Sequence, residues 1–203
     1  MGRLIYQFHI RLKKIEPPIW RRIQVPDTYN FWGLHIAIQD AMGWLDCHLH
    51  SFRFRPKHKR DFIEIGIPGE EWDDHETLPG WETELSLYLH EPGQLLEYEY
   101  DFGDGWVHDV LFEGLLVKEK GNKYPKCIGG ERACPPEDCG GVPGYYKLLD
   151  ILNDPVHEDH QDMVAWLKGH LKNYYPYNPD EFSVEKVRFS NPVTRWKKAF
   201  LEE

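Results

Sequence analysis

The chain has 203 residues, of which 41% are hydrophobic and 14% aromatic, and its formal net charge is −10. This length and aromatic content are sufficient for a substantial buried core, which excludes a largely disordered protein, and nucleic-acid-binding proteins usually have a basic balance instead. No apolar run approaches the length of a membrane span and the first residues run straight into a strand pattern, so we expect a soluble, cytoplasmic protein without a signal peptide.

The N-terminal part of the chain predicts a hairpin followed by a helix. Residues 4–12 alternate between apolar and polar side chains, which is typical of a half-buried strand, and residues 19–25 are its expected hairpin partner after the break at Pro17-Pro18. Apolar residues at helical spacing then predict a helix over residues 31–42, which is expected to end at Gly43.

Four later segments show the same alternation and are predicted to be strands, namely residues 48–54, 61–65, 96–102 and 106–112. The last two flank Gly103-Asp104-Gly105, which predicts a tight turn and therefore a second hairpin. Residues 66–82 are rich in Gly, Pro, Trp and acidic residues and are expected to be loop, and a short helix is expected at residues 85–89.

The remainder of the chain predicts a long loop and then helices. Residues 120–143 lack periodicity, and irregular segments of this length are often functional. Apolar spacing predicts helices at residues 145–152 and 163–167, and Asn178-Pro179-Asp180-Glu181 predicts one more helix start.

These elements predict the α+β class: a mostly antiparallel sheet built from two hairpins, with helices packed on it and a long Gly/Pro-rich loop. We expect a single domain over residues 1–203, in which residues 175–203 form a C-terminal helical extension.

The second predicted hairpin carries the first candidate chemistry. Asp101, Asp104 and His108 lie close together around its turn. Carboxylates and a neutral imidazole in this arrangement can hold a divalent metal, or act as acid and base. The alternative is structural, because an Asp beside a turn glycine often accepts hydrogen bonds from its own backbone.

The long loop carries the second candidate chemistry. It presents Glu137 and Asp138 between prolines and glycines, which makes both carboxylates candidate catalytic groups. It also contains three cysteines, Cys127, Cys134 and Cys139. Zinc would accept these thiolates together with an imidazole such as that of His108. The spacings are looser than in zinc fingers, and the alternative is three reduced thiols packed as small apolar groups.

Several motifs resemble those of the plasmid pRiA4b ORF-3-like family. They are Tyr100-Asp101-Phe102-Gly103-Asp104 with Trp106 and His108, Gly130-Glu131-Arg132-Ala133-Cys134-Pro135-Pro136-Glu137-Asp138-Cys139-Gly140-Gly141, residues 34–52, and Asp154-Pro155 with His157, Glu158 and His160. Together they cover about residues 5–170. The resemblance implies no established activity, although some members carry a resolvase label through association with mobile elements. The chain shows no recombinase arrangement, since Ser51 has only Arg53 and Arg55 near it on the same strand.

Two pairs of histidines are further candidates. His48 and His50 are two residues apart on a predicted strand and could bind a metal on one face, but we favour partly buried, hydrogen-bonded histidines. His157 and His160 share one face near a helix start and are candidate metal ligands. Asp154 is expected to cap that helix.

The function hypotheses differ in class. The first is a metal-binding or metal-assisted domain, for which phosphoester hydrolysis is the reaction to test. The alternative is a non-catalytic module associated with mobile elements, which binds a protein or binds nucleic acid through Arg53, Arg55 and Lys57. A basic run of this kind can equally be a solvated strand edge, and a third reading is that the loop is only structural.

Overall fold

The computed structural model describes residues 4–56, 61–69 and 76–201, and within them the strands form one eight-stranded sheet in the order β5-β4-β3-β6-β7-β1-β2-β8. The strands are β1 (Leu4–Leu12), β2 (Trp20–Pro26), β3 (His50–Phe54), β4 (Ile63–Gly66), β5 (Thr77–Pro79), β6 (Leu95–Tyr100), β7 (Trp106–Val117) and β8 (Lys126–Glu131). The β4–β5 pair is parallel and the other pairs are antiparallel. The predicted α+β class with a mostly antiparallel sheet is therefore confirmed.

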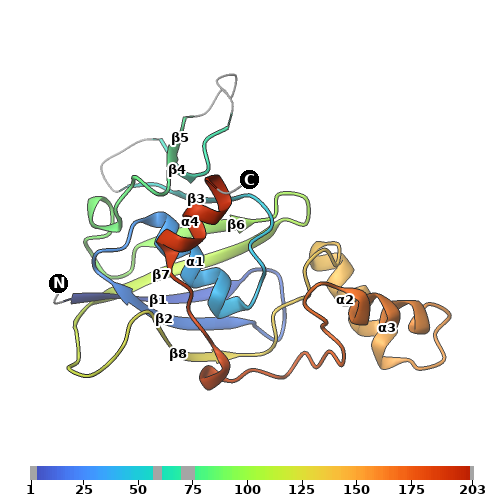
Figure 1. Ribbon diagram of the computed structural model, residues 1–203. Coiled ribbons are helices and arrows are strands. Elements are labelled where there is room, and N and C mark those ends of the chain that lie inside the picture. The colour runs from blue at the N-terminus through green and yellow to red at the C-terminus, as the bar shows by residue number, and fades with distance from the viewer. Residues whose placement is uncertain (1–3, 57–60, 70–75, 202–203) are drawn as a thin grey trace.

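Four α-helices and two short 3-10 turns accompany the sheet in the described residues. They are α1 (Phe31–Met42), α2 (Gly141–Asn153), α3 (His160–Gly169), α4 (Pro192–Phe200), η1 (Leu85–Leu87) and η2 (Val184–Lys186). Figure 1 shows α1 and α4 over the same face of the sheet, whereas α2 and α3 lie together beside one end of it. In the part of the chain that the structure describes, no helix combines the length and apolar character that a membrane span requires.

Both predicted hairpins form, and they are joined through the middle of the sheet. β1 pairs with β2 and β6 pairs with β7, while β1 also pairs with β7. Alternate side chains of these strands point into the core, where Phe8, Tyr98 and Phe112 are completely buried. The helix α1 packs on this apolar face. Its Asn30 side chain caps the backbone N–H of Gly33 at 2.8 Å, and the chain leaves the helix at Gly43 in the left-handed conformation.

The structure differs from the predictions mainly in short edge elements. β5 lies within the expected loop 66–82 and β8 within the irregular segment 120–143. Both strands are held by backbone bonds to a neighbour rather than by apolar alternation, so the hydrophobic pattern did not reveal them. The helix start expected at residues 178–181 was placed too early: η2 is only one turn, and α4 begins at Pro192, capped by Asn191.

The role expected for Asp154 was also wrong. Asp154 follows the end of α2, and its Oδ1 accepts a hydrogen bond from the backbone N–H of Val156 at 3.1 Å. The helix α3 begins only at His160, after Asp159. Asp154 therefore stabilises a turn between two helices instead of capping the second helix.

The C-terminal helix α4 packs against α1. The guanidinium of Arg195 lies 2.7 Å from Asp46 and 3.8 Å from Asp40, and the indole N–H of Trp32 donates to the carbonyl of Pro192 at 2.9 Å. The ring of Phe200 contacts that of Trp81, with 5.0 Å between centroids. The predicted single domain with a C-terminal extension over residues 175–203 stays a prediction.

Candidate metal centre

Three potential metal ligands converge where the second hairpin meets the long loop. His48 Nε2 lies 3.6 Å from Asp101 Oδ2 and 3.0 Å from Asp138 Oδ1. Among the described residues, this is the one group of three His, Cys, Asp or Glu residues whose ligand atoms all lie within 4.8 Å of one another. The residues come from three separate segments: His48 precedes β3, Asp101 follows β6, and Asp138 lies between β8 and α2.

The turn after β6 fixes the orientation of Asp101. Its backbone N–H donates to the carbonyl of Leu49 at 2.9 Å. Its Oδ1 accepts hydrogen bonds from the backbone N–H groups of Gly103 at 3.0 Å and Asp104 at 3.3 Å. The other oxygen, Oδ2, is therefore left to face His48. Oδ1 of Asp101 therefore has the structural role expected at a turn, whereas Oδ2 is available for the chemical role.

Both carboxylate residues of the cluster adopt an uncommon backbone conformation. Asp101 has φ +56° and Asp138 has φ +58°, in the left-handed region that L-residues other than Asn and Asp seldom occupy. Such conformations cost about 1–3 kcal/mol each and often occur at functional sites. The two strained backbones are what aim the two carboxylates at the same imidazole nitrogen.

The glycine-rich loop rests directly on the hairpin turn. Asp104 Oδ2 accepts a hydrogen bond from the backbone N–H of Gly140 at 3.1 Å. A Cβ atom on Gly141 would lie 2.3 Å from the carbonyl oxygen of Asp104, and one on Gly144 would lie 1.9 Å from that of Cys139. Only glycine fits at these positions, because the backbones approach too closely for any side chain. Asp104 and these glycines bring Asp138 to Asp101.

Glu137 braces the site from inside. Its side chain is buried, and its Oε1 accepts from the backbone N–H of Leu45 at 3.0 Å and from the hydroxyl of Tyr100 at 2.6 Å. Its Oε2 accepts from the thiol of Cys47 at 3.1 Å. Burial, together with this contact, raises the pKa of Cys47 to about 12, so the thiol keeps its proton and donates. Glu137 therefore ties the segment that leads to His48 onto the loop that carries Asp138.

His170 contacts Asp138 from the end of α3. Its Nε2 lies 3.8 Å from Asp138 Oδ2, and its ring packs against those of Trp166 and Tyr174. Its Nδ1 accepts a hydrogen bond from the backbone N–H of Lys172 at 3.3 Å, so in the neutral tautomer Nε2 carries the proton and faces the carboxylate. The sequence analysis did not identify His170, and it favoured a buried role for His48.

His108, also predicted for this site, lies in the core. It is completely buried, its ring contacts that of Trp44 at 5.4 Å, and its Nδ1 donates to the carbonyl of Tyr98 at 3.3 Å. Burial lowers its pKa to about 4, so the ring is neutral at neutral pH. Of the five predicted catalytic residues, the structure therefore joins Asp101 and Asp138 to His48, uses Asp104 and Glu137 as braces, and places His108 elsewhere.

The structure does not assemble the predicted cysteine site. Within the described ranges, no three of the donors Cys127, Cys134, Cys139 and His108 lie within 4.8 Å of one another. The thiol of Cys127 donates to the carbonyl of Gly129 at 3.4 Å. Burial raises the pKa of all three thiols, for Cys134 to about 12, which favours the neutral thiol in this arrangement. Zinc binding through these cysteines stays a prediction.

The remaining candidate histidines also lie outside the cluster. His157 and His160 stand at the beginning of α3, and His157 Nδ1 accepts from the backbone N–H of Asp159 at 3.0 Å. His50 is buried and stacks on His35, with 3.4 Å between ring centroids and 4° between the ring planes. Both ring nitrogens of His50 are buried and have no hydrogen-bond partner within the described ranges. The expectation of buried histidines thus describes His50, but not its hydrogen bonding.

The predicted basic surface has a mixed charge where the structure describes it. Arg53 lies on β3 directly opposite Glu64 on one side and Glu97 on the other. The guanidinium groups of Arg53 and Arg55 stack over the ring of Phe62, at 4.7 and 4.4 Å from its centroid. Lys57 lies outside the described residues. Nucleic-acid binding through these residues stays a prediction.

The fold and this site define a class of α+β protein in which a glycine- and proline-rich loop is pinned to a hairpin turn beside a His-Asp-Asp cluster. Residues 4–186 match the sequence profile described as plasmid pRiA4b ORF-3-like protein, and the chain belongs to that family, as its motifs indicated. It is 35% identical over 162 residues to the uncharacterized protein y4hQ of Sinorhizobium fredii (strain NBRC 101917 / NGR234), which covers 80% of each chain.

A solved structure shares the same fold. The crystal structure of the protein of unknown function MM3350 from Methanosarcina mazei Go1 is similar, with a TM-score of 0.81 and 37% sequence identity. The similarity covers 93% of this chain and 100% of that chain. Neither relative's name states an activity, so function has to be argued from the residues themselves.

Proposed function

We propose that this protein binds one divalent metal ion through His48 Nε2, Asp101 Oδ2 and Asp138 Oδ1. The observation that carries the proposal is the state of the imidazole nitrogen. His48 Nε2 is covered from solvent and has no hydrogen-bond partner among the described residues, although a carboxylate oxygen of Asp138 lies 3.0 Å away. A nitrogen and two carboxylate oxygens that converge without hydrogen-bonding to one another are arranged as ligands of a common ion.

The separations between the donor atoms support this proposal. Bonds of about 2.0–2.2 Å from a metal to nitrogen and oxygen place neighbouring ligand atoms about 3.0–3.5 Å apart. His48 Nε2 lies 3.0 Å and 3.6 Å from its two carboxylate oxygens, so small side-chain movements would complete the coordination. His170 would orient Asp138 through its second oxygen, as outer-shell partners of metal ligands commonly do.

The ligand types restrict the metal and suggest a reaction. One imidazole and two carboxylates suit Zn²⁺, Mn²⁺ or Fe²⁺ better than soft ions such as Cu⁺. The site is also accessible, since the side chain of Asp138 is 54% exposed and that of His48 29%. Three protein ligands at an accessible site leave coordination positions for water and a substrate oxygen. Metal-assisted hydrolysis of a phosphoester is the reaction we propose, because a bound ion both activates water and stabilises charge on the phosphoryl oxygens.

Metal titration of the stripped protein tests the binding step. We expect Zn²⁺ and Mn²⁺ to bind at one ion per chain in isothermal titration calorimetry, and elemental analysis to return the same ratio. His48→Gln and Asp101→Asn should each weaken binding by more than about 100-fold, because loss of even an outer-shell partner costs about 10–100-fold. His157→Gln is the matched control and should bind as the parent does.

Two results would decide against this site. Absence of saturable binding of Zn²⁺, Mn²⁺ and Mg²⁺ would exclude it. Binding that survives His48→Gln but is lost in the double variant Cys134→Ser, Cys139→Ser would instead favour the cysteine site. For the reaction, p-nitrophenyl phosphate and bis(p-nitrophenyl) phosphate should be hydrolysed in a metal-dependent way that Asp101→Asn removes. Metal binding without turnover of either ester would leave a metal-binding domain and refute phosphoester hydrolysis.

A further inference from the structure

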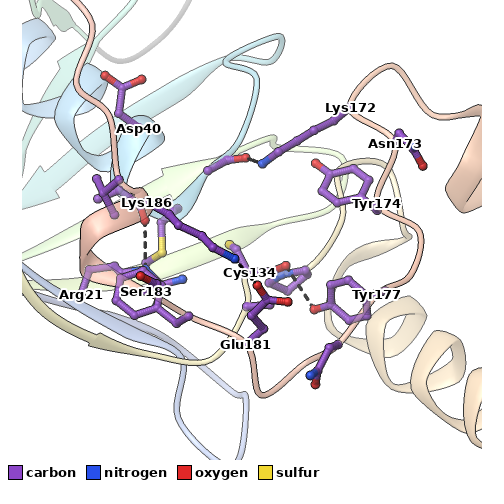
Figure 2. Close-up of a pocket in the computed structure, with 18 of the residues that line it drawn as sticks. Arg21, Asp40, Cys134, Lys172, Asn173, Tyr174, Tyr177, Glu181, Ser183 and Lys186 are labelled. Carbon is purple, nitrogen blue, oxygen red and sulfur yellow. Dashed lines mark hydrogen bonds and ion pairs between the residues drawn. The ribbon is translucent and has the colours of Figure 1, made fainter.

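A separate cavity is lined by Cys134 and Pro135 of the long loop. It has a volume of about 560 Å³, which is in the range of small-molecule sites. The end of α1, the residues after β8 and the segment 172–187 enclose it (Figure 2). None of the three proposed metal ligands lines it, so an inference about this cavity does not depend on the metal centre.

The first feature of the cavity is a buried cation. Arg21 is 1% exposed, and its guanidinium donates to the carbonyls of Ala41 at 2.9 Å, Glu131 at 2.8 Å and Arg132 at 2.8 Å. These acceptors are all neutral, and within the described part of the chain no carboxylate lies within 4.0 Å of its nitrogens. Its positive charge is thus stabilised by backbone carbonyls and by the ring of Phe182, whose centroid lies 3.8 Å from Cζ, and not by a carboxylate among the described residues.

The second feature is Lys172, which lines the cavity but is exposed, and whose ammonium lies 5.2 Å from the centroid of the Tyr174 ring. The ammonium of Lys172 donates to the carbonyl of Gly43, and in the described residues it has no ion pair. An ammonium has three donors, so two remain for a ligand. Desolvation lowers the pKa of Lys172, and the nearby Glu137 and Cys134 oppose this shift only in part.

The acidic residues of the lining do not neutralise these cations, because they are engaged elsewhere. Asp40 Oδ2 accepts from the backbone N–H of Ser190 at 2.7 Å and from its hydroxyl at 2.8 Å, and Asp40 Oδ1 faces Arg195 at 3.8 Å. Glu181 pairs with Lys186. After these pairs are set aside, the charge that remains at the cavity is positive.

The third feature is an aromatic wall. Figure 2 shows Tyr174 and Tyr177 along the side of the cavity opposite Arg21. The hydroxyl of Tyr177 donates to the carbonyl of Cys134 at 3.1 Å, and that of Tyr174 accepts from the backbone N–H of Glu137 at 3.3 Å. Both residues line the cavity, although the ring of Tyr174 also contacts that of His170 at 4.8 Å and the ring of Tyr177 contacts that of Tyr145 at 6.4 Å.

We infer that this cavity binds a small organic anion, with its carboxylate held by Lys172 and its flat apolar part against Tyr174 and Tyr177. Arg21 contributes positive potential at the far wall without donating directly. The ammonium of Lys172 matches the carboxylate of such a ligand, and the tyrosine rings match its apolar part. The acids of the lining are already paired and therefore do not repel it. A neutral ligand of the same shape would leave both cations uncompensated.

Benzoate, benzamide and acetate form the probe set, because they separate charge from shape. We expect benzoate to bind saturably in calorimetric or NMR titration. Benzamide should bind at least about tenfold more weakly because it lacks the charge that strengthens the hydrogen bond to Lys172. Acetate should bind at least about tenfold more weakly because it lacks the apolar ring. Equal binding of benzamide would refute the anion assignment, equal binding of acetate would refute the ring contact, and no saturable benzoate binding would refute the site.

Variants then locate the binding. Lys172→Met should weaken benzoate binding at least about tenfold, whereas Lys172→Arg keeps the charge and should retain it. Lys168→Met is the matched control, because Lys168 stacks over the ring of Tyr175 and does not line the cavity. Unchanged affinity in Lys172→Met would overturn the assignment.

A second pair tests the cavity without altering charge. Ala133→Leu places a larger side chain in the lining and should abolish benzoate binding, while Ala165→Leu on the exposed side of α3 should not. Circular dichroism of each variant establishes that it is folded. Benzoate binding that persists in folded Ala133→Leu would place the ligand elsewhere and refute the inference.

Discussion

His48 and His50 are two residues apart, yet they lie in opposite chemical environments. His48 stands at the surface between two carboxylates, whereas His50 is enclosed by the rings of His35, Trp32 and Phe52. In the part of the chain that the structure describes, neither nitrogen of His50 has a hydrogen-bond partner, and the fully buried His108 resembles it because its Nε2 has none. The comparison teaches that the sequence position of these three histidines does not decide their role, which follows from whether charged groups or apolar rings surround the imidazole.

The largest expected effect on stability is at Glu137, a buried residue that supports the surface cluster. Glu137→Ala should lower the free energy of unfolding by about 3–5 kcal/mol, since three donors, among them the buried hydroxyl of Tyr100, lose their acceptor at once. Urea denaturation monitored by tryptophan fluorescence measures this. Asp159→Ala, at a half-buried acid without a side-chain capping bond, is the control. A loss below about 1 kcal/mol would mean that the cluster is not braced from inside.

The second effect separates the two kinds of histidine by pH. The pKa of His108 is about 4 in the folded protein and near 6.5 when unfolded, so below pH 6.5 the unfolded chain binds a proton that the folded chain does not. The contribution of the neutral His108 to the free energy of unfolding is complete above about pH 6.5. It is lost progressively as the pH falls towards 4, by about 3 kcal/mol in all. Burial also lowers the pKa of His50 well below its usual value, which adds to the same trend.

Urea unfolding between pH 7 and pH 4 measures this dependence. The variant His108→Phe should flatten the profile, because it removes the group whose pKa differs between the two states. His48→Gln should leave the profile's shape unchanged. An identical acid dependence in His108→Phe would show that the core histidines are not the cause.

A third, smaller effect concerns the stacked pair. His50→Leu should be neutral or raise the free energy of unfolding by up to about 1 kcal/mol, because two unpaired buried nitrogens are removed. His35→Leu should instead lower it by about 1–3 kcal/mol. The His35 ring bonds the hydroxyl of Tyr98 at 2.8 Å and Asp46 at 2.7 Å, and both partners would be left without it. Equal destabilisation by His50→Leu and His35→Leu would contradict this prediction.

The smallest effect is expected at the surface. Asp138→Asn should change the free energy of unfolding of the metal-free protein by less than about 0.5 kcal/mol, because the carboxylate is exposed and its ion pairs are screened. The same variant should lose metal binding. A large loss of stability in the absence of metal would show that Asp138 is mainly structural.

The sequence predicted the hairpins and α1 because their apolar periodicity is strong and their ends are marked by Pro17-Pro18, Asn30 and Gly43. It also indicated Asp101 and Asp138, because a carboxylate beside glycines at a turn is a recognisable feature. The sequence could not rank them against Asp104 and Glu137, which have the same residue types in the same motifs. That distinction depends on which oxygen atoms meet backbone N–H groups across the fold, and spacing does not show it.

The histidines show the same limit. A period of two places His48 and His50 on one face, but β3 begins only at His50, so His48 leaves the ladder and turns towards the loop. His170 gave no signal at all, because its partner Asp138 belongs to a distant segment that only the packing of α3 brings near. The edge strands β5 and β8 were missed for a related reason: a neighbour's free backbone groups define them, not their own side chains.

The link between α4 and the core reaches beyond the part of the chain that the family match covers. That match ends at residue 186, whereas Arg195 lies in α4 and binds Asp46, which in turn binds His35 beneath it. Asp46 therefore lies within the region that matches the family, whereas its counter-charge, Arg195, lies outside that region. A chain cut after residue 186 would retain the cluster around His48 and the cavity residues Lys172, Tyr174 and Tyr177. It would lose Arg195, however, and with it the ion-pair partner of Asp40 and Asp46.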